Sequence, residues 1–164
     1  MLRLVMSRPL TIAVDVLAWG VLHSATGYLA HRLAPTRLDR DPWLLRPRAF
    51  EAGGQFYRQR LAITRWKDRL PEAGDLFSGG ISKSRLPTRD DAGLRLFVRE
   101  TRRAELGHWG AMAVSPVFLL WNPPLASALL VAYGVGVNLP FIAIQRYNRQ
   151  RAQSVLRART TTGE

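Results

Sequence analysis

Apolar runs long enough to cross a membrane alternate with strongly basic stretches along this 164-residue chain. Residues 10–31 are mostly apolar, and residues 124–144 carry no charged side chain. Each run could cross roughly 30 Å of hydrocarbon as an α-helix. A third run ends near residue 121 and is too short unless it begins near residue 104. The pattern therefore predicts an all-α fold, an integral membrane helical bundle of three or four transmembrane helices, three of them at 10–31, 104–121 and 124–144.

The basic residues indicate how these helices are oriented. Most of them fall in the loop 32–103 or in the tail 146–164, and such blocks stay on the cytoplasmic side of a membrane. The first helix would then enter the cytoplasm, the second would leave it, and Asn122 would mark an external turn before the third returns. This makes residues 1–164 a single, multi-pass domain of the cell membrane. A cleaved secretory signal fits less well, because Asp15 interrupts the first apolar run.

The basic loop and the tail carry three further features. Residues 50–66 intersperse aromatic side chains with arginines, which predicts an amphipathic helix lying in the headgroup zone of the membrane. Residues 77–83 contain two glycines and Lys83, so this segment could hold a phosphate or form a plain turn. After the third helix, residues 157–164 are polar and are expected to fray.

Composition narrows the classes of function. The formal net charge of +12 is compatible with nucleic acid, but no recognised nucleic-acid module is present, so we expect the basic residues to meet anionic lipid or a phosphorylated substrate. The absence of cysteine excludes disulfides, thiol catalysis and cysteine metal sites. With three histidines and no tight carboxylate–histidine box, no metal site is expected. His23 and His31 could line a polar groove, and Asp15 either faces a functional path or bonds a neighbouring helix as a neutral acid.

The densest chemistry lies just before the second helix becomes apolar. On a helix, Thr101, Glu105 and His108 fall within roughly 60° of one another, so a carboxylate and an imidazole can share one face. A carboxylate bonded to one ring nitrogen raises the basicity of the other, which prepares His108 to take a proton from a hydroxyl. Arg102 and Trp109 lie on the adjoining stripe. The alternative is a solvated helix end in which Arg102 and Glu105 form an ordinary i,i+3 pair.

Several sequence features together resemble a known family. They are Phe50-Glu51 with Gly54, Trp66-Lys67, the run Glu100-Thr101-x-Arg103-Ala104-Glu105-x-x-His108-Trp109, Asn138-x-Pro140, and the run Gln145-Arg146-Tyr147-Asn148-Arg149-x-Arg151. Over residues 50–151 the chain is similar to the glycosyl-diaponeurosporenoate acyltransferases. Members of that family are small integral membrane proteins that complete staphyloxanthin-type pigments by attaching a fatty acyl group to the sugar of a carotenoid glycoside.

The resemblance implies roles for these residues. His108 would be the general base for the sugar hydroxyl, and Glu105 would orient or support it. Arg146 and Arg149 would clamp the phosphate of the acyl donor, unless they only anchor the third helix as basic residues on the cytoplasmic side. Gln150 stands where the family is expected to have a proline, which predicts a looser tail. The remaining expected substrate-binding residues are Glu51, Trp66, Lys67, Glu100, Thr101, Arg102, Arg103, Trp109, Tyr147 and Asn148.

The resemblance also implies the reaction, which is transfer of a fatty acyl group onto the sugar hydroxyl of a glycosylated carotenoid or related polyisoprenoid lipid. No cofactor is expected beyond the acyl donor as co-substrate, which could be acyl-CoA, an acyl carrier protein or a phospholipid. The expected partners are membrane lipid, the glycosylated acceptor and enzymes of the same pathway. The alternative is a noncatalytic membrane adaptor whose basic loop binds anionic lipid or a partner enzyme. A cavity that gathers Glu105, His108 and arginines would favour the enzyme.

Overall fold

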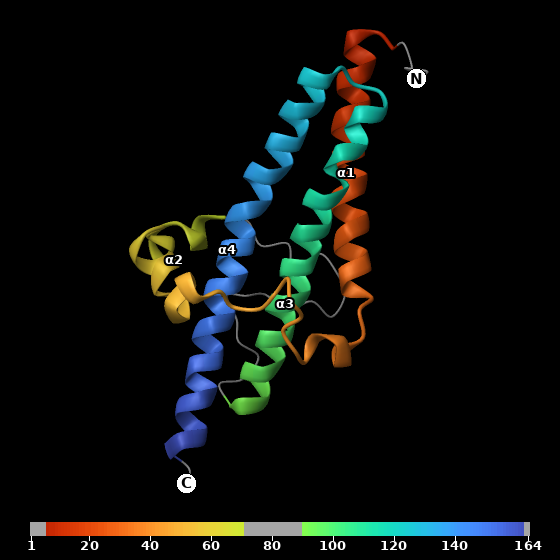
Figure 1. Cartoon of the computed structure of the whole chain (residues 1–164). Coiled ribbons are helices and arrows are strands. Elements are labelled where there is room, and N and C mark those ends of the chain that lie inside the picture. Colours follow the sequence, from red (N-terminus) through yellow and green to blue (C-terminus); the bar gives the residue numbers. More distant parts are fainter. Residues whose placement is uncertain (1–5, 71–89, 163–164) are drawn as a thin grey trace.

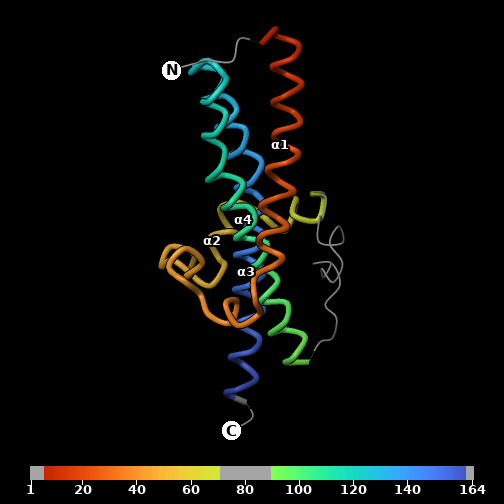
Figure 2. The backbone as a smooth tube through the Cα atoms, turned by 90° about the vertical axis from the view of Figure 1, so that its right-hand side faces the viewer, coloured from red at the N-terminus to blue at the C-terminus, as the bar shows by residue number. Residues whose placement is uncertain are grey.

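Three long helices organise the molecule. The computed structural model describes residues 6–70 and 90–162, and the regular structure in these ranges is helical (Figure 1). Helix α3 (Asp91–Val114) packs against both α1 (Arg8–His31) and α4 (Pro124–Thr162). The two ends of the chain lie at opposite ends of this bundle (Figures 1 and 2). The glycine-containing segment at 77–83, where a phosphate site or a turn was expected, lies outside the described residues.

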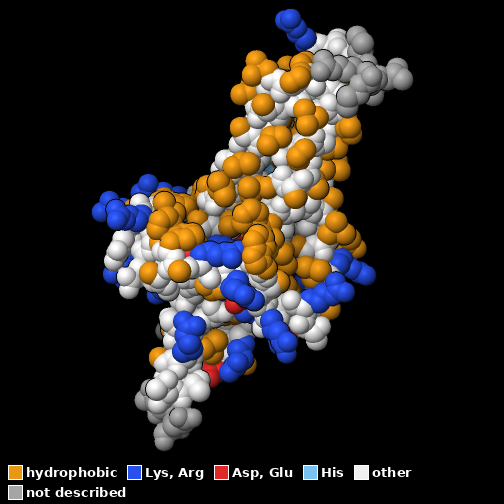
Figure 3. Space-filling model, viewed as in Figure 1, with side chains coloured by type: hydrophobic (Ala, Val, Ile, Leu, Met, Phe, Trp, Pro, Cys, Tyr) orange, Lys and Arg blue, Asp and Glu red, His pale blue; other side chains and the backbone are white. Residues whose placement is uncertain are grey.

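Two of the described helices are long and apolar enough to cross a membrane. They are α1 and α4, whose most apolar stretches have mean hydropathies of 1.3 and 1.8. Only 6% of that stretch of α1 is buried inside the protein, and large side chains such as Val16 and Leu17 are exposed. Hydrophobic atoms cover the end of the bundle that holds the start of α1, whereas Lys and Arg gather at the opposite end (Figure 3). An apolar helix that buries so little of itself in protein is suited to contact with lipid.

The expected second transmembrane helix at 104–121 is divided between the end of α3 and a 3₁₀ helix that follows it. Helix α3 begins at Asp91, where the Asp90 side chain accepts a hydrogen bond from the backbone nitrogen of Gly93 at 2.7 Å and so caps the helix. The apolar part continues as a 3₁₀ helix, η6 (Ser115–Leu120), before the chain turns. The polar residues before position 104 therefore lie on the same continuous helix as the apolar residues that follow, up to Val114.

Asp15 in α1 has a clear structural partner. Its Oδ1 accepts hydrogen bonds from Trp121 Nε1 and Asn122 Nδ2, both at 2.8 Å. These donors lie in the turn between η6 and α4, where an external turn was expected. The carboxylate therefore ties α1 to the turn of the α3–α4 hairpin, which accounts for a charged residue within an apolar run.

Helix α4 is longer than the sequence suggested. It runs without a break to Thr162, so the expectation that residues 157–164 fray is wrong as far as that residue. Its last turns pack on the first turns of α3, where Leu156 contacts the buried cluster containing Leu94 and Phe97. Further along, Arg159 Nη1 pairs with Asp91 Oδ1 at 2.8 Å. The charged half of α3 thus gives the end of α4 a surface to fold against.

The expected amphipathic helix at 50–66 is wrong as a single element. The chain instead forms η2 (Ala49–Gly54), α2 (Gln55–Gln59), η3 (Ile63–Arg65) and η4 (Lys67–Arg69). Positive φ angles interrupt it at Ala52, Gly53, Gly54 and Ala62, with values between 45° and 95°. A left-handed backbone cannot continue a right-handed helix. We call residues 39–70 the lobe, which lies beside α4 in Figure 1 and packs on it through Tyr57 and Ile63.

Small residues let the three long helices approach closely. Gly107 and Gly110 of α3 face Ala30 and Thr26 of α1 at 3.6 and 3.4 Å from an idealised Cβ. The contact of Gly134 in α4 is tighter, since a Cβ there would lie 2.4 Å from Cη2 of Trp19. Such spacing is typical of helix packing in membrane proteins. It brings α1, α3 and α4 together on the apolar side of the candidate site.

Candidate active site

His108 lies at the contact between α3 and α4, half-buried. Its Nδ1 is 2.9 Å from Oδ1 of Asn138, a residue of α4 that is almost fully buried. The Asn138 amide is oriented by its other end, because Nδ2 donates to the carbonyl oxygen of Gly134 at 2.8 Å. The Oδ1 atom therefore accepts a hydrogen bond from Nδ1–H, and in a neutral ring this places the lone pair on Nε2.

An aromatic ring also restrains the imidazole. Phe141, one turn after Asn138, stacks on His108 with centroids 4.9 Å apart and planes 9° from parallel. The ring is thus held by a hydrogen bond at its edge and by a stacked ring on its face. A neutral imidazole held in a single tautomer, with Nε2 as the basic atom, can act as a general base.

Glu105 faces arginines rather than Nδ1 of His108. The Glu105 side chain is fully buried, and Oε1 accepts from Arg146 Nε at 2.7 Å and from Trp109 Nε1 at 3.1 Å. Its Oε2 accepts from Arg149 Nη1 at 2.6 Å. The Nδ1 partner that was expected to be this carboxylate is the amide of Asn138.

The two arginines of α4 are engaged by protein acceptors. Arg146 also pairs with Glu51 through Nη1 and donates from Nη2 to the carbonyl oxygen of Leu44 at 2.6 Å. Arg149 is fully buried and donates from Nη2 to the carbonyl oxygen of Leu45 at 2.7 Å. Every nitrogen of Arg146 thus faces an acceptor of the protein itself. These contacts support a role in joining the lobe to α3 and α4, and the expected phosphate clamp stays a prediction.

The same network continues to the start of the lobe. Asp41 Oδ1 accepts from Arg102 Nε at 2.7 Å and lies 3.6 Å from Arg149 Nε. Burial alone would raise the pKa of the Asp41 carboxyl, but the hydrogen bond from Arg102 and the charges of Arg102 and Arg149 outweigh it and hold that pKa below its usual value. Asp41 is therefore ionised at neutral pH.

The network balances its charge. It contains three guanidinium groups and three carboxylates, namely those of Arg102, Arg146, Arg149, Asp41, Glu51 and Glu105. Gln150 belongs to it as well, since its Nε2 donates to Glu51 and the residue is almost fully buried. The expectation that Gln150 loosens the tail is therefore wrong. Buried charges are tolerable when each one is paired and hydrogen-bonded. Removing one member would leave its partner buried without a counter-charge, which destabilises the fold.

Other expected site residues have local structural partners. Arg103 donates from Nη1 to the carbonyl oxygens of Ala30 and Leu33, each at 3.1 Å, and also to that of His31. Its Nε donates to Glu100 Oε1 at 3.2 Å. Arg103 therefore caps the carboxyl end of α1, where backbone carbonyls lack helical partners. The buried Thr101 hydroxyl donates to the carbonyl oxygen of Val98 at 2.7 Å, within α3 itself.

The remaining expected residues lie in the lobe or where α4 runs beside it. Trp66 Nε1 donates to the carbonyl oxygen of Leu61 at 2.8 Å, and Lys67 pairs with the neighbouring Asp68. Tyr147 is buried in the cluster that joins the lobe to α4, and Asn148 beside it is half-buried.

Several residues of this region escaped interpretation from sequence. Asn138 was named in a family motif but was given no role, although a polar residue within an uncharged apolar run is a usable signal for a functional contact. Asp41 gave no local signal, because its partners follow 61 and 108 residues later. Gln145 is fully buried, and its amide has no hydrogen bond to the described part of the chain.

Comparisons with known proteins identify the family. Residues 41–158 match the family model described as glycosyl-4,4'-diaponeurosporenoate acyltransferase. A protein of that name from Staphylococcus aureus strain USA300 is 30% identical over 116 residues, which cover 70% of this chain and 69% of the relative. The same-named protein of strain MRSA252 is 29% identical over the same length. No solved structure matches the chain. The chain, whose matched segment contains His108, Asn138 and the whole charge network, therefore belongs to the glycosyl-4,4'-diaponeurosporenoate acyltransferase family and is an acyltransferase.

Proposed function

We propose that this acyltransferase esterifies a fatty acyl group onto a sugar hydroxyl of a glycosylated carotenoid or a related polyisoprenoid lipid at the cell membrane. The names of the relatives support acyl transfer to a carotenoid glycoside. The observation that carries the proposal is the hydrogen bond from His108 Nδ1 to Asn138 Oδ1, because it leaves Nε2 as the proton acceptor. A noncatalytic adaptor would not require this arrangement.

The position of His108 along α3 suits an amphiphilic acceptor. Apart from the buried Glu105, the charged residues of α3 end at Arg103, which caps α1 at Ala30 and His31. His108 follows five residues later, about 8 Å further toward the apolar end. A glycolipid with its chain in the membrane presents its sugar near such a boundary. The acceptor hydroxyl would therefore meet the base without leaving the interface.

The proposed reaction needs one base and no metal. Nε2 of His108 takes the proton of the sugar hydroxyl while that oxygen attacks the acyl carbonyl carbon. The tetrahedral intermediate then expels the thiolate or alkoxide of the donor, and the imidazolium returns the proton to that leaving group. A new ester bond replaces the thioester or ester of the donor. The acyl donor, whether acyl-CoA, an acyl carrier protein or a phospholipid, is a co-substrate, and we propose no cofactor.

The charge network would support this reaction indirectly. Glu105 joins Arg146 and Arg149, so it sets the spacing of α3 and α4 one turn from His108. We propose that it supports the base through this spacing. Among the expected acceptor-binding residues, Glu100, Trp109 and Asn148 are half-buried, so they keep some access to a substrate. We propose them as the contacts for the sugar.

We further propose a three-pass arrangement in the membrane. Helix α1, the apolar end of α3 with η6, and the first half of α4 would cross the bilayer, with the lobe and the end of α4 in the cytoplasm. The excess of arginine in these two parts supports this orientation. The donor would then be a cytoplasmic one, and the partners would be membrane lipid, the glycolipid acceptor and enzymes of the same pathway.

The test is acyl transfer by the purified protein in nanodiscs, with a carotenoid glycoside and acyl-CoA as substrates. His108→Ala should lower the rate by about 10² to 10⁴ without loss of folded protein, because a general base contributes roughly this much. His31→Ala, which removes an imidazole at the end of α1, is the matched control and should keep full activity. Wild-type turnover by the His108→Ala protein would refute the mechanism. Lipid profiles of a host with and without the gene would then show whether an unacylated glycolipid accumulates.

A further inference from the structure

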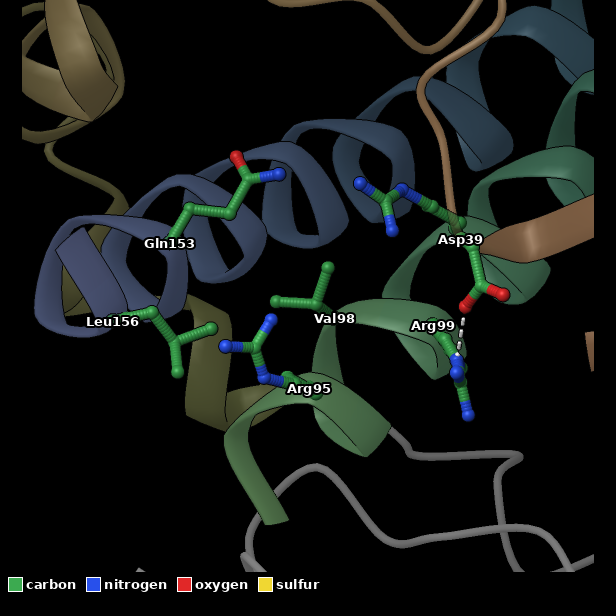
Figure 4. A pocket seen from close by; sticks show the side chains of 7 residues that line it. Asp39, Arg95, Val98, Arg99, Gln153 and Leu156 are labelled. Atoms are coloured by element: carbon green, nitrogen blue, oxygen red, sulfur yellow. Dashed lines mark hydrogen bonds and ion pairs between the residues drawn. The ribbon is translucent and has the colours of Figure 1, made fainter. Parts of the chain in front are cut away.

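A pocket of about 400 Å³ opens between the charged ends of α3 and α4 (Figure 4). Three arginines and one aspartate contribute to its wall, which leaves two positive charges in excess. The lining residues are Asp39, Arg95, Val98, Arg99, Arg102, Gln153 and Leu156. The close-up shows the Arg95 guanidinium beside Val98 and Leu156, so charged and apolar groups meet in the same hollow.

The arginines of the pocket are engaged to different degrees. Arg102 is bound by Asp41 and by the carbonyl oxygen of Leu38. Arg99 Nε pairs with Asp39 Oδ1 at 2.5 Å, but both side chains are about two-fifths exposed, and such surface pairs contribute little. Within the residues that the structure describes, Arg95 forms no ion pair or hydrogen bond. Arg95 and Arg99 can therefore bind an anion without breaking the buried network.

The pocket is separate from the candidate active site. Arg99 precedes His108 by nine residues, which is about two and a half helical turns, so the two side chains leave α3 on opposite faces. The lining residues of α3 also precede Gly107, which packs on the end of α1, by five to twelve residues. This places the pocket about 8 to 18 Å along α3 from the end of the apolar region. The ligand therefore need not reach the base.

We propose that this pocket binds a phosphate ester, with Arg95 and Arg99 as its anchors. Guanidinium groups bind phosphate oxygens in a forked, charge-assisted geometry, and two of them on one helix face match a single phosphate. Val98 and Leu156 would contact the carbon attached to the phosphate. The same chemistry is present in the headgroup of an anionic phospholipid and in a soluble ester such as coenzyme A.

The experiment measures binding to the purified full-length protein in a zwitterionic detergent. The first arm titrates coenzyme A by calorimetry, and the second counts bound phosphatidylglycerol against phosphatidylcholine by native mass spectrometry. The variant Arg95→Gln with Arg99→Gln removes the anchors. The matched control, Arg58→Gln with Arg60→Gln, removes the same charge from exposed positions in the lobe. Each lost charge-assisted contact should weaken binding about tenfold.

The two arms identify the source of the phosphate. If the pocket variant binds coenzyme A more weakly and the control variant does not, the ligand is a soluble phosphate ester. If the pocket variant loses bound phosphatidylglycerol but not phosphatidylcholine, the ligand is a lipid headgroup. If both variants weaken binding equally, only nonspecific charge is involved and the proposal is wrong. It is also wrong if the wild-type protein binds neither ligand, or if the pocket variant binds both as the wild type does.

Discussion

At the scale of single residues, the hydrogen-bond partner of His108 Nδ1 is the amide of Asn138 and not the expected carboxylate of Glu105. An amide can fix the tautomer of an imidazole, but it carries no negative charge that would stabilise the protonated ring. A carboxylate in the same place would stabilise the imidazolium and raise the basicity of the ring. Asn138 would therefore orient the proposed base without supplying a charge that stabilises the protonated ring.

This assignment makes Asn138 a positioning residue with a specific signature. Asn138→Ala should lower kcat about tenfold or more, because the ring loses the contact that fixes its tautomer. In the His108→Ala background the same change should have little further effect, because its influence passes through the imidazole. Steady-state kinetics of the two single variants and the double variant measure this. Effects that multiply in the double variant would show that Asn138 acts independently of His108.

The buried charges around Glu105 call for a different test, since they are bound to one another. Glu105→Gln should destabilise the fold by about 3 to 5 kcal/mol, because two buried arginines lose a partner. Adding Arg149→Gln restores the charge balance, so the double variant should be less destabilised than the sum of the single ones. Unfolding of the purified proteins in detergent gives these values. An inactive Glu105→Gln protein with unchanged stability would instead place Glu105 among the reacting groups.

The sequence placed residues on helix faces better than it showed what they touch. Glu105 and His108 could be placed on one helix face because periodicity fixes that relation. Contacts such as Arg102 with Asp41 join residues 61 positions apart, and no local pattern encodes them. The roles of the two α4 arginines were left open for the same reason.

At the scale of the helices, the contact between Trp19 of α1 and Gly134 of α4 determines how α1 packs on the α3–α4 hairpin. Gly134 leaves room for the indole of Trp19, which also stacks on His23 at 5.1 Å between centroids. Asp15 fixes the same helix one turn earlier through Trp121. Helix α1 is thus attached by a carboxylate and by an aromatic side chain seated on a glycine.

Gly134→Ala should therefore push α1 away from α4. Its Cβ would lie 2.4 Å from the Trp19 ring, and overpacking of this kind costs about 1 to 3 kcal/mol. Gly136→Ala is the matched control, because a Cβ there meets no atom within 4 Å, and it should be neutral or stabilise the helix by up to about 1 kcal/mol. Thermal unfolding of both variants in detergent checks the difference. Equal effects would mean that this glycine contact does not hold α1.

Helix positions were predictable from the apolar runs, whereas the lobe was not. Hydropathy placed α1 and the start of α4 within a few residues. The lobe was expected to be one helix, yet Ala62 and Ala52 adopt positive φ angles that alanine disfavours in isolation. Packing of Tyr57 and Ile63 against α4 accompanies this backbone, and such tertiary contacts cannot be read from local propensity.

At the scale of the whole molecule, apolar and basic surfaces occupy opposite ends (Figure 3). The lobe and the end of α4 share the basic end, although they are far apart in sequence. Arginine distribution predicted this grouping, but the length of α4 was not predicted. At 39 residues it extends about 58 Å, nearly twice the thickness of the hydrocarbon core.

The three-pass orientation can be tested with single cysteines, because the chain contains none. Pro123→Cys should react with an impermeant thiol reagent in intact cells, since the turn between η6 and α4 is expected outside. Arg58→Cys and Ser154→Cys should react only after permeabilisation, because arginine-rich parts stay in the cytoplasm. All three positions are exposed, so accessibility within the protein is matched. Labelling of Pro123→Cys and Ser154→Cys from the same side would exclude a crossing by α4.

Arg103 has a consequence for how the amino-terminal helix can change. Its guanidinium grips α1 through the carbonyl oxygens of Ala30, His31 and Leu33, which are main-chain atoms. Main-chain carbonyls are the same for every residue type, so this attachment depends only on the position along α3 at which α1 ends. A different apolar helix that ended at the same level would be gripped equally well. The side chains at positions 30, 31 and 33, which lie outside the family match, can therefore change while this link between α1 and α3 persists.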